Sequence, residues 1–126
     1  MALRHGEPVF VISVAARLLE MHPQTLRKYE REGLVAPSRT TGNLRLYSDE
    51  DLELLRQVKY LVNERGLNLA GVQLVLEASR RARSLHARLA DESVDGAAPR
   101  NQTLRSELNA LLALLGAGEP SPQHRT

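Results

Sequence analysis

The chain has 126 residues and contains no cysteine, no tryptophan, one phenylalanine and three tyrosines. The absence of cysteine excludes disulfide bonds, thiolate zinc sites and redox sensing by thiols. The scarcity of aromatic residues argues against an aromatic-rich all-β domain and against a stacking platform for single-stranded nucleic acid. The length fits one ordinary domain, or a small domain with an appended segment.

Long hydrophobic runs are missing too. The apolar run at residues 9–12 is shorter than the roughly 7–15 residues of a signal sequence. Residues 110–115 fall far short of the about 20 residues needed to span a membrane. We therefore expect a cytoplasmic protein without a membrane segment. Because 17 Lys and Arg oppose 15 Asp and Glu, the net charge is only +2, and the distribution of charge along the chain is more informative than its total.

Two short helices joined by a tight turn are predicted near the start of the chain, after a flexible N-terminus at residues 1–8. Ser13 can cap the first helix. Pro23 suits the first position of the second helix, over residues 24–32, and Gly33 can end it in the left-handed conformation. We expect these helices to share a small core made of Leu18, Leu26, Tyr29 and Leu34.

The following segment changes to a β-type pattern. Residues 44–47 alternate apolar and polar side chains, and we predict that they form a short hairpin with residues 34–35 whose exposed tip carries Arg39. Ser48 begins a third helix, and acidic residues in its first turns suit the positive end of the helix dipole. Gly66 ends this helix and Asn68 caps the next one.

Leucine stripes dominate the C-terminal part. Apolar spacing continues from Leu74 to Leu89, residues 94–99 interrupt it, and leucines then recur from Leu104 at heptad intervals. A helix that extends past a small domain must bury such a stripe, so we favour an antiparallel coiled coil between two copies; the second leucine seam covers this coil or forms a further contact. The predicted dimerisation residues are Leu85, Leu89, Leu104, Leu108 and Leu111.

The predicted fold class is mainly α. A winged helix-turn-helix domain at residues 9–77 is followed by a helical dimerisation region at residues 78–115, with its antiparallel coiled coil, and by a disordered tail at residues 116–126.

Positive charge gathers between residues 23 and 47, where five basic residues oppose two acidic ones and the local net charge is +3. Neutralising DNA phosphates requires such a concentration of charge, and a helix in the major groove needs short polar and basic side chains near its N-terminal half. We therefore predict base contacts from Gln24, Thr25 and Lys28, and phosphate contacts from Arg27, Arg39, Arg45 and the Tyr47 hydroxyl.

Plainer interpretations stand beside these predictions. A basic helix is often only a solvated face, and Tyr29 is better explained by packing than by base contacts. The four histidines are scattered and have no cysteine companions, so we expect no metal site, and without a catalytic constellation we expect neither an enzyme nor a cofactor. An arginine cluster could contact DNA flanks or a chaperone, although a solvated helix face is favoured; it consists of Arg80, Arg81, Arg83 and Arg88.

Three segments resemble the MerR family. Residues 21–35 (MHPQTLRKYEREGLV) resemble its recognition segment, residues 42–52 (GNLRLYSDEDL) its wing and third-helix start, and residues 66–72 (GLNLAGV) its fourth-helix entry. Within the family, the runs at residues 12–16, 21–27 and 68–72 are most similar to heat-shock repressors. The resemblance covers roughly residues 9–90. Lys28 departs from the pattern by replacing an aromatic residue, and His22 stands where Ser or Thr commonly caps the second helix.

The resemblance implies a homodimer that binds an inverted-repeat operator in double-stranded DNA and bends or untwists it. It further implies repression of chaperone operons, with the Hsp70 chaperone DnaK as co-repressor. Three alternatives remain. A ligand-responsive activator of the same family is disfavoured by the missing cysteines and the short C-terminal part, and an excisionase-like bending protein by the leucine stripes. A helical protein-interaction adaptor would lack salt-dependent DNA binding.

Overall fold

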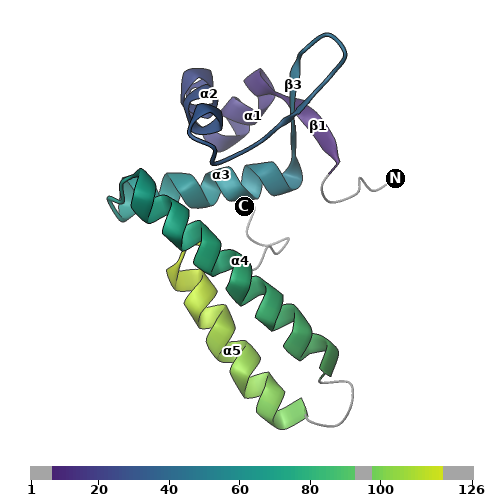
Figure 1. Ribbon diagram of the computed structural model, residues 1–126, viewed down its shortest axis with the longest axis vertical. Helices are drawn as coiled ribbons and strands as arrows, with labels where there is room; N and C mark the ends of the chain where they lie inside the picture. The colour runs from purple at the N-terminus through teal and green to yellow at the C-terminus, as the bar shows by residue number, and fades with distance from the viewer. Residues whose placement is uncertain (1–6, 93–97, 118–126) are drawn as a thin grey trace. The chain divides into compact units, whose positions relative to one another are not determined.

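The computed structural model describes residues 7–92 and 98–117, which divide between a first unit, Met1–Tyr60, and a second, Leu61–Thr126 (Figure 1). The first unit contains β1 (Pro8–Val11), α1 (Ile12–Leu19), α2 (Pro23–Arg31), β2 (Ser38–Arg39), β3 (Arg45–Ser48) and α3 (Asp49–Lys59). A π-helix, η1 (Tyr60–Glu64), is followed by α4 (Leu69–Glu92) and α5 (Ala98–Leu114). The predicted mainly helical fold is confirmed. Most of the predicted chain break, tail and flexible N-terminus lies outside the described residues. Within the described part, α5 already begins at Ala98, inside the predicted break, and Ala117 of the predicted tail is 4% exposed.

The first helix begins earlier than predicted. α1 starts at Ile12, directly after strand β1, and its N-cap residue Val11 makes no side-chain cap. Ser13 therefore lies inside the helix and is exposed, so the prediction that it caps α1 is wrong. Leu18 is 49% exposed and Leu19 is buried instead, which corrects the predicted core residue. The cause is the angular step of about 100° per helical residue, which places neighbouring residues on different faces.

The second helix follows the predicted punctuation. Pro23 is its first residue, and the Nδ1 atom of His22 accepts a hydrogen bond of 3.0 Å from the backbone N–H of Gln24. An imidazole thus makes the cap that Ser or Thr makes elsewhere. Gly33 has a φ of 81°, so the predicted left-handed end is confirmed. The backbone N–H of Leu34 then donates to the carbonyl of Tyr29 at 3.0 Å, a bond typical of a helix end closed by glycine.

The sheet differs from the predicted hairpin. It has three antiparallel strands in the order β1-β3-β2, and β1 occupies residues that we had not expected to be a strand. Residues 34–35 are buried but do not pair with β3, because the backbone N–H of Leu34 closes α2. Arg39 therefore lies within strand β2, opposite Arg45, and not at the tip of the hairpin. Asn43, with a φ of 66°, lies in the turn instead.

The core of the first unit forms between its helices and β3. Leu26, Tyr47 and Leu55 are completely buried, and Leu52 is 2% exposed. The ammonium group of Lys59 at the end of α3 donates to the carbonyl of Leu19 at 2.9 Å, which joins the C-terminal ends of α3 and α1. A cation at these carbonyls also interacts favourably with the helix dipole. The burial of Leu26 in this core thus holds α2 in place from its inner side.

Ser48 caps α3 as predicted. Its hydroxyl accepts the backbone N–H of Asp51 at 3.0 Å, and the Asp51 carboxylate accepts the backbone N–H of Ser48 at 3.0 Å. This reciprocal arrangement is a capping box.

Replacing Ser48 by alanine is expected to lower the free energy of unfolding by about 1 kcal/mol, because the first turn of α3 loses its side-chain acceptor. Urea unfolding measures the change. Ser13→Ala is the matched control, since Ser13 caps no helix and its replacement should cost much less. Equal losses in the two variants would contradict the assignment of the cap to Ser48.

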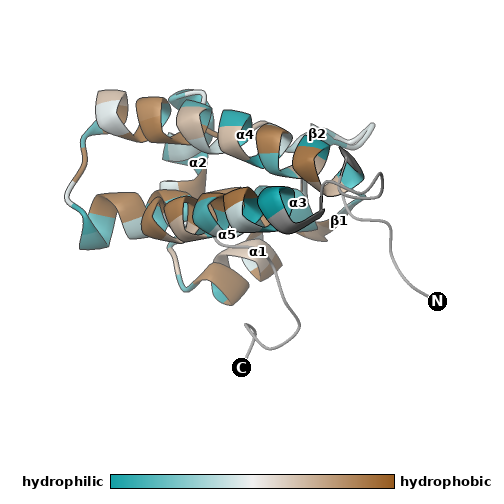
Figure 2. Ribbon diagram, turned by 90° about the horizontal axis from the view of Figure 1, so that it is seen from below, coloured by the Kyte–Doolittle hydropathy of each residue, from teal (hydrophilic) through white to brown (hydrophobic). Residues whose placement is uncertain are grey.

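The second unit is an antiparallel pair of helices (Figure 1). The side chain of Asn68 accepts the backbone N–H of Gly71 at 2.9 Å, so the predicted cap of α4 is confirmed. Gly116, with a φ of 80°, follows α5 as predicted. Hydrophobic and hydrophilic segments alternate along α4 in Figure 2. A small core forms where Ala82 of α4 packs with Leu112 and Ala117. α4 continues without interruption past residue 77, where we placed the domain boundary; that boundary stays a prediction. Among the described residues, no helix combines the length and apolarity needed to cross a bilayer.

Candidate nucleic-acid interface

Helix α2 has an inner apolar face and an outer polar face. Leu26 is completely buried and Tyr29 is 8% exposed, which confirms that Tyr29 is a packing residue. Burial is the largest cause that raises the pKa of Tyr29, and the nearby Glu32 carboxylate adds to it. Gln24 and Lys28, one turn apart, are exposed. The structure therefore places Gln24 and Lys28 on the face of α2 that does not pack on the core, whereas Thr25 and Arg27 are half-buried.

Gln24 and Arg27 interact with each other. The Nη1 atom of Arg27 donates to the side-chain oxygen of Gln24 at 2.9 Å. This bond uses the amide oxygen of Gln24 and leaves its two amide N–H groups as donors. We predicted that Gln24 contacts a base and that Arg27 contacts a phosphate. The bond makes the position of each side chain depend on the other.

The β2–β3 hairpin, residues 38–48, is the wing, and its two arginines converge on one carboxylate. The Nη2 atom of Arg39 lies 3.0 Å from Oε2 of Glu30, and the Nε atom of Arg45 lies 2.6 Å from Oε1 of the same residue. The hydrogen bond from Arg45 is the largest influence that lowers the pKa of Glu30, and Arg39 lowers it further. From the sequence alone, Glu30 counts only as a local negative charge. Two arginines opposite each other in a hairpin would have been the signal for this counter-charge.

Tyr47 does not lie where a DNA contact requires it. Its side chain is completely buried, and its hydroxyl has no hydrogen-bond partner among the described residues. Burial is the main cause that raises its pKa. The predicted alternation along β3 is correct, since Tyr47 follows Arg45 by two residues, but this face of the strand packs into the core. The prediction that the Tyr47 hydroxyl contacts a phosphate is therefore corrected.

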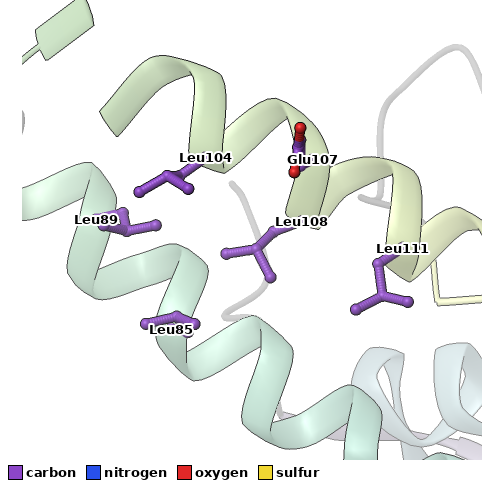
Figure 3. Close-up of a pocket in the computed structure, with 6 residues that line it drawn as sticks. All are labelled: Leu85, Leu89, Leu104, Glu107, Leu108 and Leu111. Atoms are coloured by element: carbon purple, nitrogen blue, oxygen red, sulfur yellow. The ribbon is translucent and has the colours of Figure 1, made fainter. Parts of the chain in front are cut away.

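All five predicted dimerisation leucines border a single groove between α4 and α5 (Figure 3). Its volume is about 420 Å³. Leu85 and Leu89 come from α4, and the leucines of α5 point toward them across the groove. The leucines of α5, from Leu104 onward, therefore face the leucines of α4 in the same chain. Three of these side chains keep a large exposed fraction: Leu85 at 42%, Leu104 at 44% and Leu111 at 43%.

The arginine cluster of α4 is partly neutralised within the helix. Glu77 pairs with Arg80 at i+3 and with Arg81 at i+4, and these bonds lower its pKa, the one from Arg80 most strongly. Such pairs are typical of a solvated helix surface. In the described ranges, no three acidic or histidine side chains form a group that could hold a metal ion.

Comparison with known proteins identifies relatives in sequence. Residues 10–79 match a family described as "MerR HTH family regulatory protein". The chain is 51% identical over 98 residues to the Streptomyces coelicolor protein HspR, described as a heat shock protein, with 76% of this chain and 65% of that protein aligned. It is 40% identical over 73 residues to the HTH-type transcriptional regulator GlnR of Bacillus anthracis, with 58% of this chain and 56% of that protein aligned. The chain thus covers less than two thirds of either relative.

The fold is also found among solved structures. A transcriptional regulator of the MerR family from Bacillus cereus superimposes with a TM-score of 0.51 over 91% of this chain and 88% of that one, at 21% sequence identity. This likeness extends across both structural units and supports the predicted fold.

Proposed function

Since this chain belongs to the MerR family of helix-turn-helix regulatory proteins, we propose that it is a homodimeric, sequence-specific repressor of heat-shock or chaperone genes. It binds an inverted repeat in double-stranded DNA, with the chaperone DnaK as co-repressor. The observation that carries this proposal is the 51% identity to HspR. That alignment, over 98 residues, is longer than the segment matched by the family, so it extends beyond the DNA-binding part.

DNA binding is assigned to α2 and the wing. Gln24 and Lys28 read base edges from the outer face of α2, where donors and acceptors can reach the major groove. Thr25, which is half-buried beside them, is assigned to the same base contacts. Arg27 contacts the phosphate backbone. Arg39 and Arg45 also contact phosphates. A guanidinium has five N–H donors, so each arginine can use the N–H groups that Glu30 does not engage. Tyr47 acts from below this surface as a packing residue.

Dimerisation is assigned to the leucine groove of the second unit, with a second copy of this chain as its occupant. Exposed leucines around one apolar groove are typical of a protein interface. The repetition of leucines on both walls supports a self-complementary contact, because a two-fold dimer places the same surface on both subunits. An inverted repeat has the same symmetry as such a dimer.

A ligand-responsive activator is the second candidate, and the groove is the observation that favours it. A volume of about 420 Å³ lies within the range of small-molecule sites. Such sites combine apolar walls with a few converging polar groups. Of the six residues that line the groove, five are leucines and only Glu107 is charged. The lining therefore fits a leucine-rich partner helix better than a polar effector.

The proposal is tested by incubating the purified chain with fragmented genomic DNA of its host and sequencing the bound fragments. We expect inverted repeats upstream of chaperone operons. Addition of purified DnaK should then tighten binding to a recovered repeat in a gel-shift assay. Repeats upstream of unrelated genes, with no effect of DnaK, would contradict the heat-shock assignment. Failure to retain any fragment, even at low salt, would instead favour the protein-interaction adaptor, since phosphate contacts strengthen as salt falls.

A further inference from the structure

One carboxylate, that of Glu30, connects α2, the proposed recognition helix, with the wing. We propose that Glu30 is a positioning residue for sequence recognition: by holding Arg39 and Arg45 together against α2, it fixes the wing relative to the recognition helix and limits attraction to DNA of any sequence. This inference rests on the DNA-binding function proposed above and adds to it a residue that sets specificity without touching a base.

The geometry assigns one oxygen of Glu30 to each arginine. Oε2 accepts from Nη2 of Arg39 at 3.0 Å, and Oε1 accepts from Nε of Arg45 at 2.6 Å. The side chains of Glu30 and Arg45 are 22% and 25% exposed, so both lie mostly out of water. Hydrogen bonds between ionised groups are shorter and stronger than neutral ones. Glu30 therefore joins α2 to two strands of the wing at once.

The wing needs such a counter-charge. Arg39 and Arg45 are direct partners across the β2–β3 pair, and like charges directly opposite in a sheet destabilise it. A carboxylate between them removes this repulsion. Arg39 is also held from the turn, because its Nη1 atom donates to the side-chain oxygen of Asn43 at 3.2 Å. Together these bonds fix the tip of the wing to the C-terminal half of α2.

The same arrangement leaves Arg45 able to bind DNA. Glu30 engages its Nε atom, while its two terminal nitrogens make no hydrogen bond to any described residue. A guanidinium held at Nε keeps four N–H groups for a phosphate. Three charged side chains then present a net charge of +1 in place of the +2 of two free arginines. Less charge weakens binding to every sequence, whereas a fixed position favours the one duplex whose backbone matches it.

Glu30→Gln tests the proposal because it removes the charge and keeps the shape. The probes are a duplex that the wild-type chain enriches from a random-sequence pool and a scrambled duplex of the same composition. We expect several-fold tighter binding to the scrambled duplex and about a tenfold fall in the ratio of the two affinities, the size of one charged hydrogen bond. The slope of log affinity against log salt should steepen by about 0.9 for each additional phosphate that the freed arginines neutralise.

Two further variants make the test specific. Glu32→Gln removes the same charge from a residue just past α2 that makes none of the wing contacts, and should keep the wild-type ratio. Arg45→Lys keeps the positive charge but loses the Nε donor. It should lower the ratio without tightening non-specific binding. If Glu30→Gln is unfolded at the assay temperature, Arg45→Lys still tests the proposal.

Three results separate failure of the inference from failure of the function. If Glu30→Gln and Arg45→Lys both keep the wild-type ratio and salt slope, Glu30 does not position the wing. If Glu32→Gln lowers the ratio equally, total charge is the cause and the inference is again overturned. If the wild-type chain enriches no duplex from the pool, the proposed function itself is wrong.

Discussion

The Leu85→Glu variant is expected to be monomeric and to bind an operator more weakly than the wild type by about a hundredfold or more. Leu85 borders the leucine groove and is 42% exposed, so in a dimer the new carboxylate would be buried among leucines without a partner, at a large cost. Losing the link between two half-site contacts removes an avidity of roughly 10²–10⁴. Sedimentation velocity gives the oligomeric state, and a gel-shift titration gives the affinity.

Leu74→Glu is the matched control. Leu74 lies on the same helix and is 72% exposed, but it does not border the groove, so its variant should remain dimeric. A helical circular-dichroism spectrum equal to that of the wild type would show that Leu85→Glu is folded. A Leu85→Glu protein that still sediments as a dimer would refute the groove as the dimer contact.

Replacing Tyr47 by alanine is expected to lower the free energy of unfolding by about 3–5 kcal/mol, because the ring is completely buried and its removal leaves a cavity. Tyr47→Phe should instead raise it by about 1 kcal/mol, since it removes a buried hydroxyl that has no partner among the described residues. Urea unfolding of the two variants distinguishes these effects.

The same pair of variants tests the corrected role of Tyr47. DNA affinity of Tyr47→Phe should equal that of the wild type, because a buried hydroxyl cannot donate to a phosphate. A tenfold loss of affinity with unchanged stability would mean that the hydroxyl contacts DNA, as predicted from the sequence.

Local signals made most of the helices predictable. Pro23, Gly33, Ser48, Asn68 and Gly116 each act on the backbone within a few residues, so their effects can be worked out without knowing the fold. Strand β1 was missed because its pairing with β3 joins residues far apart in the sequence. The hairpin was misplaced for a related reason: residues 34–35 have a β-type composition, but the end of α2 already uses the backbone N–H of Leu34.

The candidate site was predictable where it depends on local spacing and unpredictable where it depends on packing. Helical spacing was enough to place Gln24 and Lys28 on the outer face of α2. It could not show that Arg39 and Arg45 share Glu30, because that contact depends on how the wing packs against the helix. Alternation along β3 placed Arg45 and Tyr47 on one face, yet only the packing decides that this face is buried at Tyr47. The leucine seams were found from their spacing, whereas their meeting within one chain depends on the antiparallel packing of α4 and α5.

The pairing of β1 with β3 also determines when the first unit can fold during synthesis. Val11 pairs with Leu46, so β1 leaves the ribosome well before its partner exists. Until then its apolar residues are unpaired, and closing so long a loop is slow. Helices α1 and α2 need only neighbouring residues and can form earlier. We therefore expect the β1–β3 pairing to form after α1 and α2, and a newly made chain to acquire its recognition helix before it can hold that helix against the wing.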